Sequence, residues 1–251
     1  MAFDLSGKLA IVTGGASGIG IGISEMIAEA GALVVIADRD AAGAERQAAA
    51  LEQAGHKADW VQLDLADEAS IVRACAEVET KHGAAWVLVN NAGLQDRQKL
   101  LDADAAYWDR IHTVNARGPY LMMREIGRQM VRAGKGGRIV NVGSSSVGRP
   151  MIQGLTGYTA SKAAVVSMSQ SAAFELAGDN ITVNTVHPGG VGTPGAISAK
   201  GPPPEGPGRR APPLGMCQPR DIGAAVLFFA SPEAHRVTNQ VITVDAGFFL
   251  T

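Results

Sequence analysis

Short apolar runs alternate with longer helical stretches along the whole chain, and this alternation constrains the fold more than any other feature. The predicted strands are Leu9–Thr13, Leu33–Ala37, Ala58–Leu63, Trp86–Asn90, Arg138–Val142, Ile181–Val186 and Val241–Val244. The predicted helices end near Ala30 and Ala54 or span Glu68–His82, about Ala106–Ala133 and about Thr156–Ala177. Strands that are apolar at nearly every position are buried on both faces, which is typical of parallel sheets in α/β proteins. The sequence predicts an α/β fold with a doubly wound, parallel seven-stranded sheet and helices on both of its faces.

No break in composition marks a second domain, so we expect residues 1–251 to form a single domain. Residues 194–215 depart from the alternation, because proline and glycine crowd this stretch and exclude a long helix. The stretch leaves the carboxyl end of the sixth strand, at the edge of an open parallel sheet where ligands bind. Two interpretations stay open: a disordered surface loop, and a mobile lid over a substrate site.

Composition argues against several classes of function. The net charge is -2 without a basic block, and aromatic residues make up only 5%, so we expect neither nucleic acid nor an anionic membrane as partner. Cys75 and Cys217 are interpreted as free thiols in a reducing compartment, and no cysteine or histidine cluster indicates a metal site. The N-terminus has no signal-peptide pattern and no apolar run is long enough to span a bilayer, so we expect a cytoplasmic protein.

A glycine-rich turn, residues 13–20, joins the first strand to the first helix. Gly14, Gly18 and Gly20 allow a tight turn and close approach of the backbone to a pyrophosphate. The helix N-terminus beyond the turn supplies unpaired N–H groups and the positive end of a dipole. Other tight turns look similar, but the position between strand and helix favours a dinucleotide site of the Rossmann type.

Asp38 ends the second strand and favours NAD over NADP. A carboxylate at this position can accept hydrogen bonds from the adenine-ribose hydroxyls, and it would repel a 2′-phosphate. Two alternatives stay open. Asp38 could start a turn or cap the next helix, and the neighbouring Arg39 could pair with a 2′-phosphate.

Tyr158 and Lys162 are four residues apart, a spacing that places both side chains on one face of a helix. A free phenol titrates near pH ~10 and is a poor base at neutral pH. An ammonium about 4 Å away contributes roughly 4 kcal/mol at an effective dielectric of ~20. We therefore expect Lys162 to lower the pKa of Tyr158 toward neutrality. Since this spacing is common in helices, the pair alone does not identify a catalytic site.

The motifs together resemble the short-chain dehydrogenase/reductase family, in the family's order and spacing, over Lys8–Gly247. The resemblance implies a catalytic tetrad of Asn115, Ser145, Tyr158 and Lys162, with Ser145 preferred over Ser144 and Ser146 because it lies thirteen residues before Tyr158. It implies a cofactor site formed by Gly14, Ser17, Gly18, Ile19, Gly20, Asp38, Asp64, Leu65, Asn91, Ala92, Gly93, Tyr158, Lys162, Pro188, Val191 and Thr193. Ser17 stands where members that prefer NADP often carry a basic residue, in agreement with Asp38.

The resemblance implies an NAD-dependent enzyme in which Tyr158 is the general acid/base for hydride transfer between nicotinamide and a secondary alcohol or ketone. Ser145 would orient the substrate oxygen, Lys162 would hold the nicotinamide ribose, and Asn115 would position a water through its helix backbone. Residues 94–96, 147–155, 189–190 and the lid would form the substrate pocket. A homotetramer is implied as well. The alternatives are an enzyme like a 3-oxoacyl-(acyl-carrier-protein) reductase and a non-catalytic NAD-binding protein.

Overall fold

Seven parallel strands form one sheet in the computed structural model, which describes residues 3–149 and 152–250. The strands are β1 (Leu9–Thr13), β2 (Leu33–Asp38), β3 (Lys57–Gln62), β4 (Val87–Asn90), β5 (Gly137–Val142), β6 (Ile181–Pro188) and β7 (Val241–Val244). Their order across the sheet is β3-β2-β1-β4-β5-β6-β7, and every neighbouring pair is parallel. The predicted doubly wound parallel sheet is confirmed.

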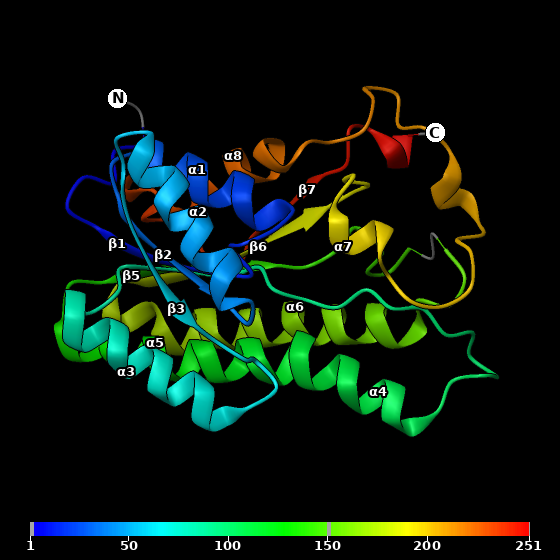
Figure 1. Cartoon of the computed structure of the whole chain (residues 1–251), viewed down its shortest axis with the longest axis horizontal. Helices are drawn as coiled ribbons and strands as arrows, with labels where there is room; N and C mark the ends of the chain where they lie inside the picture. The colour runs from blue at the N-terminus through cyan, green and yellow to red at the C-terminus, as the bar shows by residue number, and fades with distance from the viewer. Residues whose placement is uncertain (1–2, 150–151, 251) are drawn as a thin grey trace.

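Helices cover both faces of this sheet (Figure 1). They are α1 (Ile19–Glu29), α2 (Ala41–Gln53), α3 (Glu68–His82), α4 (Ala105–His112), α5 (Gly118–Ala133), α6 (Thr156–Leu176), α7 (Pro194–Ile197) and α8 (Pro219–Ala230). Helices α1, α2 and α8 pack over one hydrophobic core, and α3, α5 and α6 pack over a second core on the opposite face. None of the described helices has the length and apolarity that crossing a membrane requires.

Local sequence signals set the helix ends. The Asp67 carboxylate accepts a hydrogen bond from the Ala69 amide (2.9 Å) and caps α3, and Gly83 (φ 85°) ends that helix in a conformation that favours glycine. At α8, Gln218 and Asp221 form a reciprocal capping box. Residues at the helix ends therefore fix where these core-covering helices begin and end.

The predicted long helical region before β5 contains a π-helical turn, Thr113–Arg117, between α4 and α5. The Gly118 amide bonds the Thr113 carbonyl five residues earlier. Proline at position 119 has no N–H for the Asn115 carbonyl four residues before it, so a regular α-helix cannot continue there. The turn places Asn115 at the carboxyl edge of the sheet.

The order of the sheet reverses between β1 and β4, which are neighbours although their chains continue to opposite sides. In doubly wound sheets, such a switch point opens a crevice beyond the carboxyl ends of the strands. The glycine-rich turn follows β1, and the segment 91–93 follows β4, so both predicted cofactor segments meet at this point.

Candidate active site

The glycine-rich turn after β1 is packed so closely that side chains are excluded from it. Gly14 (φ 65°) and Gly18 (φ 54°) have left-handed backbone conformations. A Cβ atom on Gly20 would overlap the Gly14 carbonyl oxygen, and one on Gly14 would lie 2.8 Å from Ala92 Cα. Only glycine fits these positions, which leaves the backbone open to close approach by a pyrophosphate.

The N-terminus of α1 carries no side-chain cap. Its N-cap residue is Gly18, and its first turn has no acidic residue. Ser17 is exposed, and its carbonyl accepts a hydrogen bond from the Gly20 amide (3.0 Å). An uncapped first turn, beginning at Ile19, and the helix dipole form an anion-binding position. With the glycines, this terminus fits the diphosphate of a dinucleotide.

Asp38 lies at the end of β2 and faces the glycine-rich turn. Its Oδ2 accepts a hydrogen bond from the Ala16 amide (3.2 Å), and its Oδ1 accepts one from the Asp40 amide (3.0 Å). The carboxylate therefore has the turn-forming role that was one of the two interpretations. It is half-buried beside the turn, so it can also accept from a ribose hydroxyl and repel a phosphate. Arg39 is exposed.

The segment after β4 is bonded to the glycine-rich turn. Thr13 Oγ1 accepts hydrogen bonds from the amides of Asn91 and Ala92, each at 3.1 Å. Asn91 Nδ2 donates to the carbonyls of Thr13 (2.9 Å) and Gly14 (3.2 Å). Asn91 and Ala92, both predicted cofactor residues, thus hold the turn in shape.

Gly93 lies where the predicted cofactor segment meets the predicted catalytic residues. A Cβ atom on Gly93 would lie 3.2 Å from Asn115 Oδ1 and 3.3 Å from Lys162 Nζ. Lys162 is buried, and its Nζ donates a hydrogen bond to the Val142 carbonyl (2.8 Å). Burial lowers the Lys162 pKa to about 8. The structure brings segment 91–93, Asn115 and Lys162 to one place.

The stretch after β6 returns to the glycine-rich turn. Pro188 ends β6, and Val191 forms an isolated parallel bridge with Cys217. A Cβ atom on Gly18 would lie 3.1 Å from Thr193 Cβ. Thr193 therefore packs against the N-terminus of α1, close to the anion-binding position.

Asp64 and Leu65 follow β3, farther along the same edge of the sheet. Asp64 is half-buried, and its Oδ1 accepts a hydrogen bond from the Ala66 amide (2.9 Å). Leu65 is buried, and a Cβ atom on Gly118 would lie 2.8 Å from Leu65 Cβ. This pair packs against the start of α5, and its contact with a cofactor stays a prediction.

Tyr158 has a side-chain hydrogen bond with Ser144, which directly precedes Ser145, the serine that the spacing selects. The choice of Ser145 as the catalytic serine stays a prediction. Ser144 Oγ also lies 2.8 Å from Ser146 Oγ. Ser145 is buried, and its amide donates to the Pro188 carbonyl (3.0 Å).

The prediction that Lys162 lowers the pKa of Tyr158 is wrong for this structure. Burial raises the Tyr158 pKa, and the hydrogen bond from Ser144 offsets part of that rise. The physical reason is that Lys162 Nζ donates its hydrogen bond to the Val142 carbonyl, and that burial also lowers the pKa of Lys162 itself. Tyr158 is therefore a neutral phenol at neutral pH.

Residues 194–215 lie across the segment that follows β4. Their only α-helix among the described residues is the short α7, which agrees with the predicted absence of a long helix. Arg97 Nε donates to the Pro202 carbonyl (2.9 Å), and its Nη2 donates to the Ala199 carbonyl (3.3 Å). The Asp96 carboxylate accepts a hydrogen bond from the Lys200 amide (2.8 Å). A cavity of about 530 Å³ lies at this junction.

The predicted pocket segment 147–155 includes residues 150 and 151, which lie outside the described residues. Within the described part, the Gln153 amide donates to the Glu205 carbonyl (2.8 Å), so this segment also contacts residues 194–215. The structure therefore brings the segments 94–96 and 152–155 and the proline-rich stretch to one side of the site.

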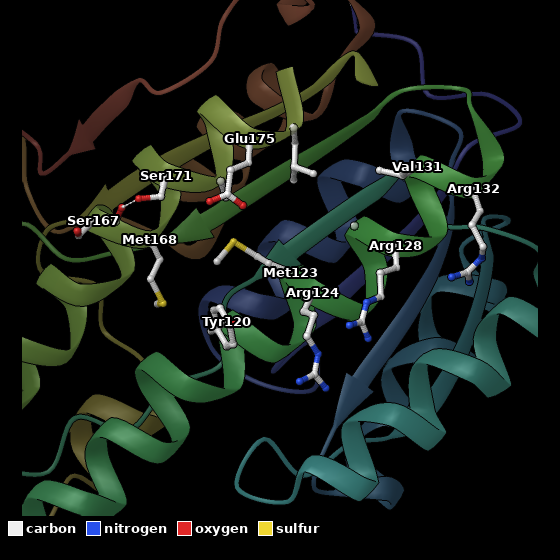
Figure 2. Close-up of a pocket in the computed structure, with 13 residues that line it drawn as sticks. Tyr120, Met123, Arg124, Arg128, Val131, Arg132, Ser167, Met168, Ser171 and Glu175 are labelled. Carbon is white, nitrogen blue, oxygen red and sulfur yellow. Dashed lines mark hydrogen bonds between the residues drawn. The ribbon is translucent and has the colours of Figure 1, made fainter. Parts of the chain in front are cut away.

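A separate groove of about 570 Å³ runs between α5 and α6, and Figure 2 shows the side chains that line it. The groove has an apolar floor that includes Met123 and Met168, and a rim with Arg124, Arg128 and Glu175. None of the predicted catalytic or cofactor residues lines it. It is a surface distinct from the crevice at the switch point.

Comparison with known proteins agrees with this geometry. Residues 14–249 match a family model described as enoyl-(acyl carrier protein) reductase. A short-chain type dehydrogenase/reductase structure from Mycobacterium marinum superposes with a TM-score of 0.90 at 30% identity, covering 99% of this chain and 98% of that one. The chain belongs to the short-chain dehydrogenase/reductase family.

Two further relatives of this short-chain dehydrogenase/reductase differ in their reactions. Galactitol 2-dehydrogenase (L-tagatose-forming) of Cereibacter sphaeroides is 38% identical over 98% of this chain and 96% of its own. The 3-ketoacyl-(acyl-carrier-protein) reductase of Brucella melitensis, solved in complex with NADH, is 36% identical, with a TM-score of 0.89 and coverage of 98% and 99%. Both are oxidoreductases, so the chain is an oxidoreductase of a family that binds a nicotinamide cofactor.

Proposed function

We propose that this chain is an NAD-dependent alcohol dehydrogenase or ketone reductase that transfers hydride between nicotinamide and a secondary alcohol or ketone. The observation that carries the proposal is the position of Gly93. It adjoins both Asn115 and Lys162, while Asn91 and Ala92 beside it are bonded to the glycine-rich turn. A cofactor laid across the turn would therefore have its far end beside the catalytic residues. When bound, the nicotinamide supplies or accepts the hydride.

Tyr158 exchanges the proton with the substrate oxygen in this proposal. Its raised pKa keeps the phenol protonated at neutral pH, which suits proton donation during ketone reduction. In alcohol oxidation the phenol must first ionise, so we expect oxidation to be favoured on the alkaline side of neutrality. Ser145 is the serine that we expect to donate a hydrogen bond to the same substrate oxygen, and the neighbouring Ser144 bonds Tyr158.

Lys162 and Asn115 assist the proton exchange by Tyr158 in this proposal. Lys162 is anchored on the Val142 carbonyl and lies next to Gly93, from where its Nζ can reach the hydroxyls of a nicotinamide ribose. Asn115 lies in the π-helical turn, where Pro119 leaves its carbonyl without the usual α-helical donor. That carbonyl is suited to hold a water that passes protons to solvent.

The preference for NAD rests on Asp38. Its half-buried carboxylate accepts hydrogen bonds from the Ala16 and Asp40 amides at the edge of the glycine-rich turn, so a 2′-phosphate would meet its negative charge there. The Brucella melitensis relative with NADH supports this choice. A parent enzyme that already prefers NADP would refute it.

The substrate is a small or medium secondary alcohol or ketone, and cyclic, aromatic, polyol and steroid compounds all remain open. The galactitol dehydrogenase relative makes polyols the first class to test. The second candidate is 3-oxoacyl-(acyl-carrier-protein) reduction, supported by the Brucella melitensis relative and by the exposed pair Arg209–Arg210. A non-catalytic NAD-binding role is disfavoured because the serine, tyrosine and lysine are all present.

We propose a homo-oligomer, a tetramer by family resemblance, with α5 and α6 at one subunit interface. The groove between these helices, which Tyr120 and Val131 of α5 line with exposed side chains, would be covered by a second copy. Phe174 is also exposed on α6. A cytoplasmic location is also proposed, and the two buried free cysteines, Cys75 and Cys217, support a reducing compartment.

A panel of substrates tests the proposal. Purified parent protein is incubated with NAD or NADP and with polyols, cyclic alcohols and aromatic alcohols, and in the reverse direction with β-ketoacyl thioesters. We expect NADH to form from NAD with at least one alcohol, and NADPH to form more slowly when NADP replaces NAD. NADPH-dependent reduction of β-ketoacyl thioesters alone would favour the second candidate, and no turnover on any substrate with intact NADH binding would favour the non-catalytic protein.

A further inference from the structure

Two buried hydrogen-bond relays end on helix α6, and each consists of an asparagine amide, a serine hydroxyl and a backbone carbonyl. In the first, Asn115 Nδ2 donates to Ser161 Oγ (3.1 Å), and Ser161 Oγ donates to the Tyr158 carbonyl (2.6 Å). The asparagine amide therefore donates a hydrogen bond to the serine hydroxyl, and the serine hydroxyl donates one to a helix carbonyl. Asn115 and Ser161 are both fully buried.

In the second relay, Asn141 Nδ2 donates to Ser169 Oγ (2.8 Å), and Ser169 Oγ donates to the Val165 carbonyl (2.7 Å). Both members are buried, as in the first relay. Ser169 lies about two turns beyond Ser161 on α6. The second relay ends on a core valine, whereas the first ends on the carbonyl of the proposed acid/base residue.

The Asn115 side-chain amide makes three hydrogen bonds, and both of its N–H donors are used. Asn115 Oδ1 accepts from the Leu94 amide (2.7 Å), and Nδ2 donates to the Leu94 carbonyl (2.8 Å) as well as to Ser161. The asparagine is thus clamped between the segment after β4 and helix α6. Because it lies in the π-helical turn, its position depends on these side-chain bonds more than on a regular backbone pattern.

We propose that Ser161 is a positioning residue for the proton exchange, because its hydroxyl joins the Asn115 amide to the helical turn that carries Tyr158 and Lys162. This inference rests on the proposed function. Ser161 does not touch substrate or cofactor. It sets the distance between the π-helical turn and the phenol, and a displacement of about 1 Å in a reacting geometry can cost about 100-fold in rate.

Removal of the Ser161 hydroxyl leaves an Asn115 N–H buried without an acceptor and frees the Tyr158 carbonyl from its second donor. Removal of the Ser169 hydroxyl makes the same kind of lesion at Asn141. The two alanine variants are therefore a matched pair: both lose one buried serine oxygen on α6, and only one loses it beside the site.

The experiment compares Ser161→Ala and Ser169→Ala in the full-length protein, with thermal unfolding, NADH binding and steady-state kinetics measured for each. We expect similar losses of thermal stability and parent-like NADH affinity in both. We expect kcat to fall about 10- to 100-fold in Ser161→Ala with KM nearly unchanged, and less than about threefold in Ser169→Ala. Equal kcat values in the two variants would overturn the inference.

A double-mutant cycle separates positioning from general destabilisation. If Ser161 acts through Asn115, adding Ser161→Ala to Asn115→Ala should lower kcat by less than about threefold, far less than in the parent background. Fully additive losses would overturn the inference. An inactive parent protein would instead refute the proposed function, so the two failures are distinguishable.

Discussion

The glycine-rich turn after β1 and the proline-rich segment 194–215 lie at the same edge of the sheet, and Gly18 of the turn packs against Thr193 just before the segment. They are held in different ways. The turn is fixed by backbone packing in which a Cβ atom on Gly20 has no room. The segment is fixed by hydrogen bonds, from the Arg97 side chain to the Ala199 and Pro202 carbonyls and from the Arg97 and Gln153 amides to the Lys200 and Glu205 carbonyls.

This difference suggests that the glycine-rich turn and the proline-rich segment have different tasks. A turn with no spare volume presents the same backbone to every cofactor molecule. A segment held by a few part-buried hydrogen bonds can detach at modest cost, since each such bond contributes only about 1 kcal/mol. We therefore expect cofactor binding to depend on the turn and substrate entry to depend on the segment.

The largest effect should come from placing the same methyl group in each region. Gly20→Ala puts a Cβ atom onto the Gly14 carbonyl, whereas Gly195→Ala in α7 meets nothing within 4 Å. We expect Gly20→Ala to abolish NADH binding measured by fluorescence titration, and Gly195→Ala to bind like the parent. Normal NADH binding by Gly20→Ala would contradict the claim that cofactor binding depends on the close packing of the turn.

The next effect concerns Lys162, which adjoins Gly93. Its pKa of about 8 in the folded protein is below its ordinary value of 10.5. Between these pH values the folded state binds fewer protons than the unfolded state, so the free energy of unfolding rises with pH, by at most about 3 kcal/mol. Urea unfolding should show this rise in the parent and in Lys135→Met, an exposed control, and lose it in Lys162→Met. The same pH dependence in all three proteins would contradict the assignment.

These two regions also show what the sequence can predict. The strands and the glycine-rich turn follow from apolar runs and from glycine, which are local properties, and Leu9–Thr13 and Glu68–His82 match the structure residue for residue. The direction of the Tyr158 pKa shift was wrong, and the choice of Ser145 over Ser144 stays a prediction. Both depend on how closely segments that are distant in sequence approach each other, which local patterns do not reveal.

A smaller effect should separate the two serines. Ser145→Ala removes the hydroxyl that we propose bonds the substrate oxygen, so we expect kcat to fall about 10- to 100-fold. Ser144→Ala removes a hydrogen bond to Tyr158 and keeps the Ser145 hydroxyl, so it should lose less than about tenfold. Steady-state kinetics with one alcohol substrate measures both. A greater loss in Ser144→Ala would favour Ser144 as the catalytic serine.

The smallest effect should come from releasing the proline-rich segment. Arg97→Ala removes both side-chain bonds to its carbonyls, and we expect KM for the alcohol to rise about two- to fivefold with NADH affinity unchanged. Arg209→Ala, an exposed substitution within the segment, is the matched control and should behave like the parent. Weaker NADH binding in Arg97→Ala would show that the turn and the segment are not independent.

The central claim is that Tyr158 exchanges the proton while the rest of the site binds the cofactor. Tyr158→Phe tests it most directly, with Tyr120→Phe on the exposed face of α5 as control. NADH formation and NADH binding are measured on the same preparations. We expect Tyr158→Phe to bind NADH like the parent and to form NADH at least about 100-fold more slowly, while Tyr120→Phe keeps the activity of the parent. Turnover by Tyr158→Phe close to that of the parent would contradict it.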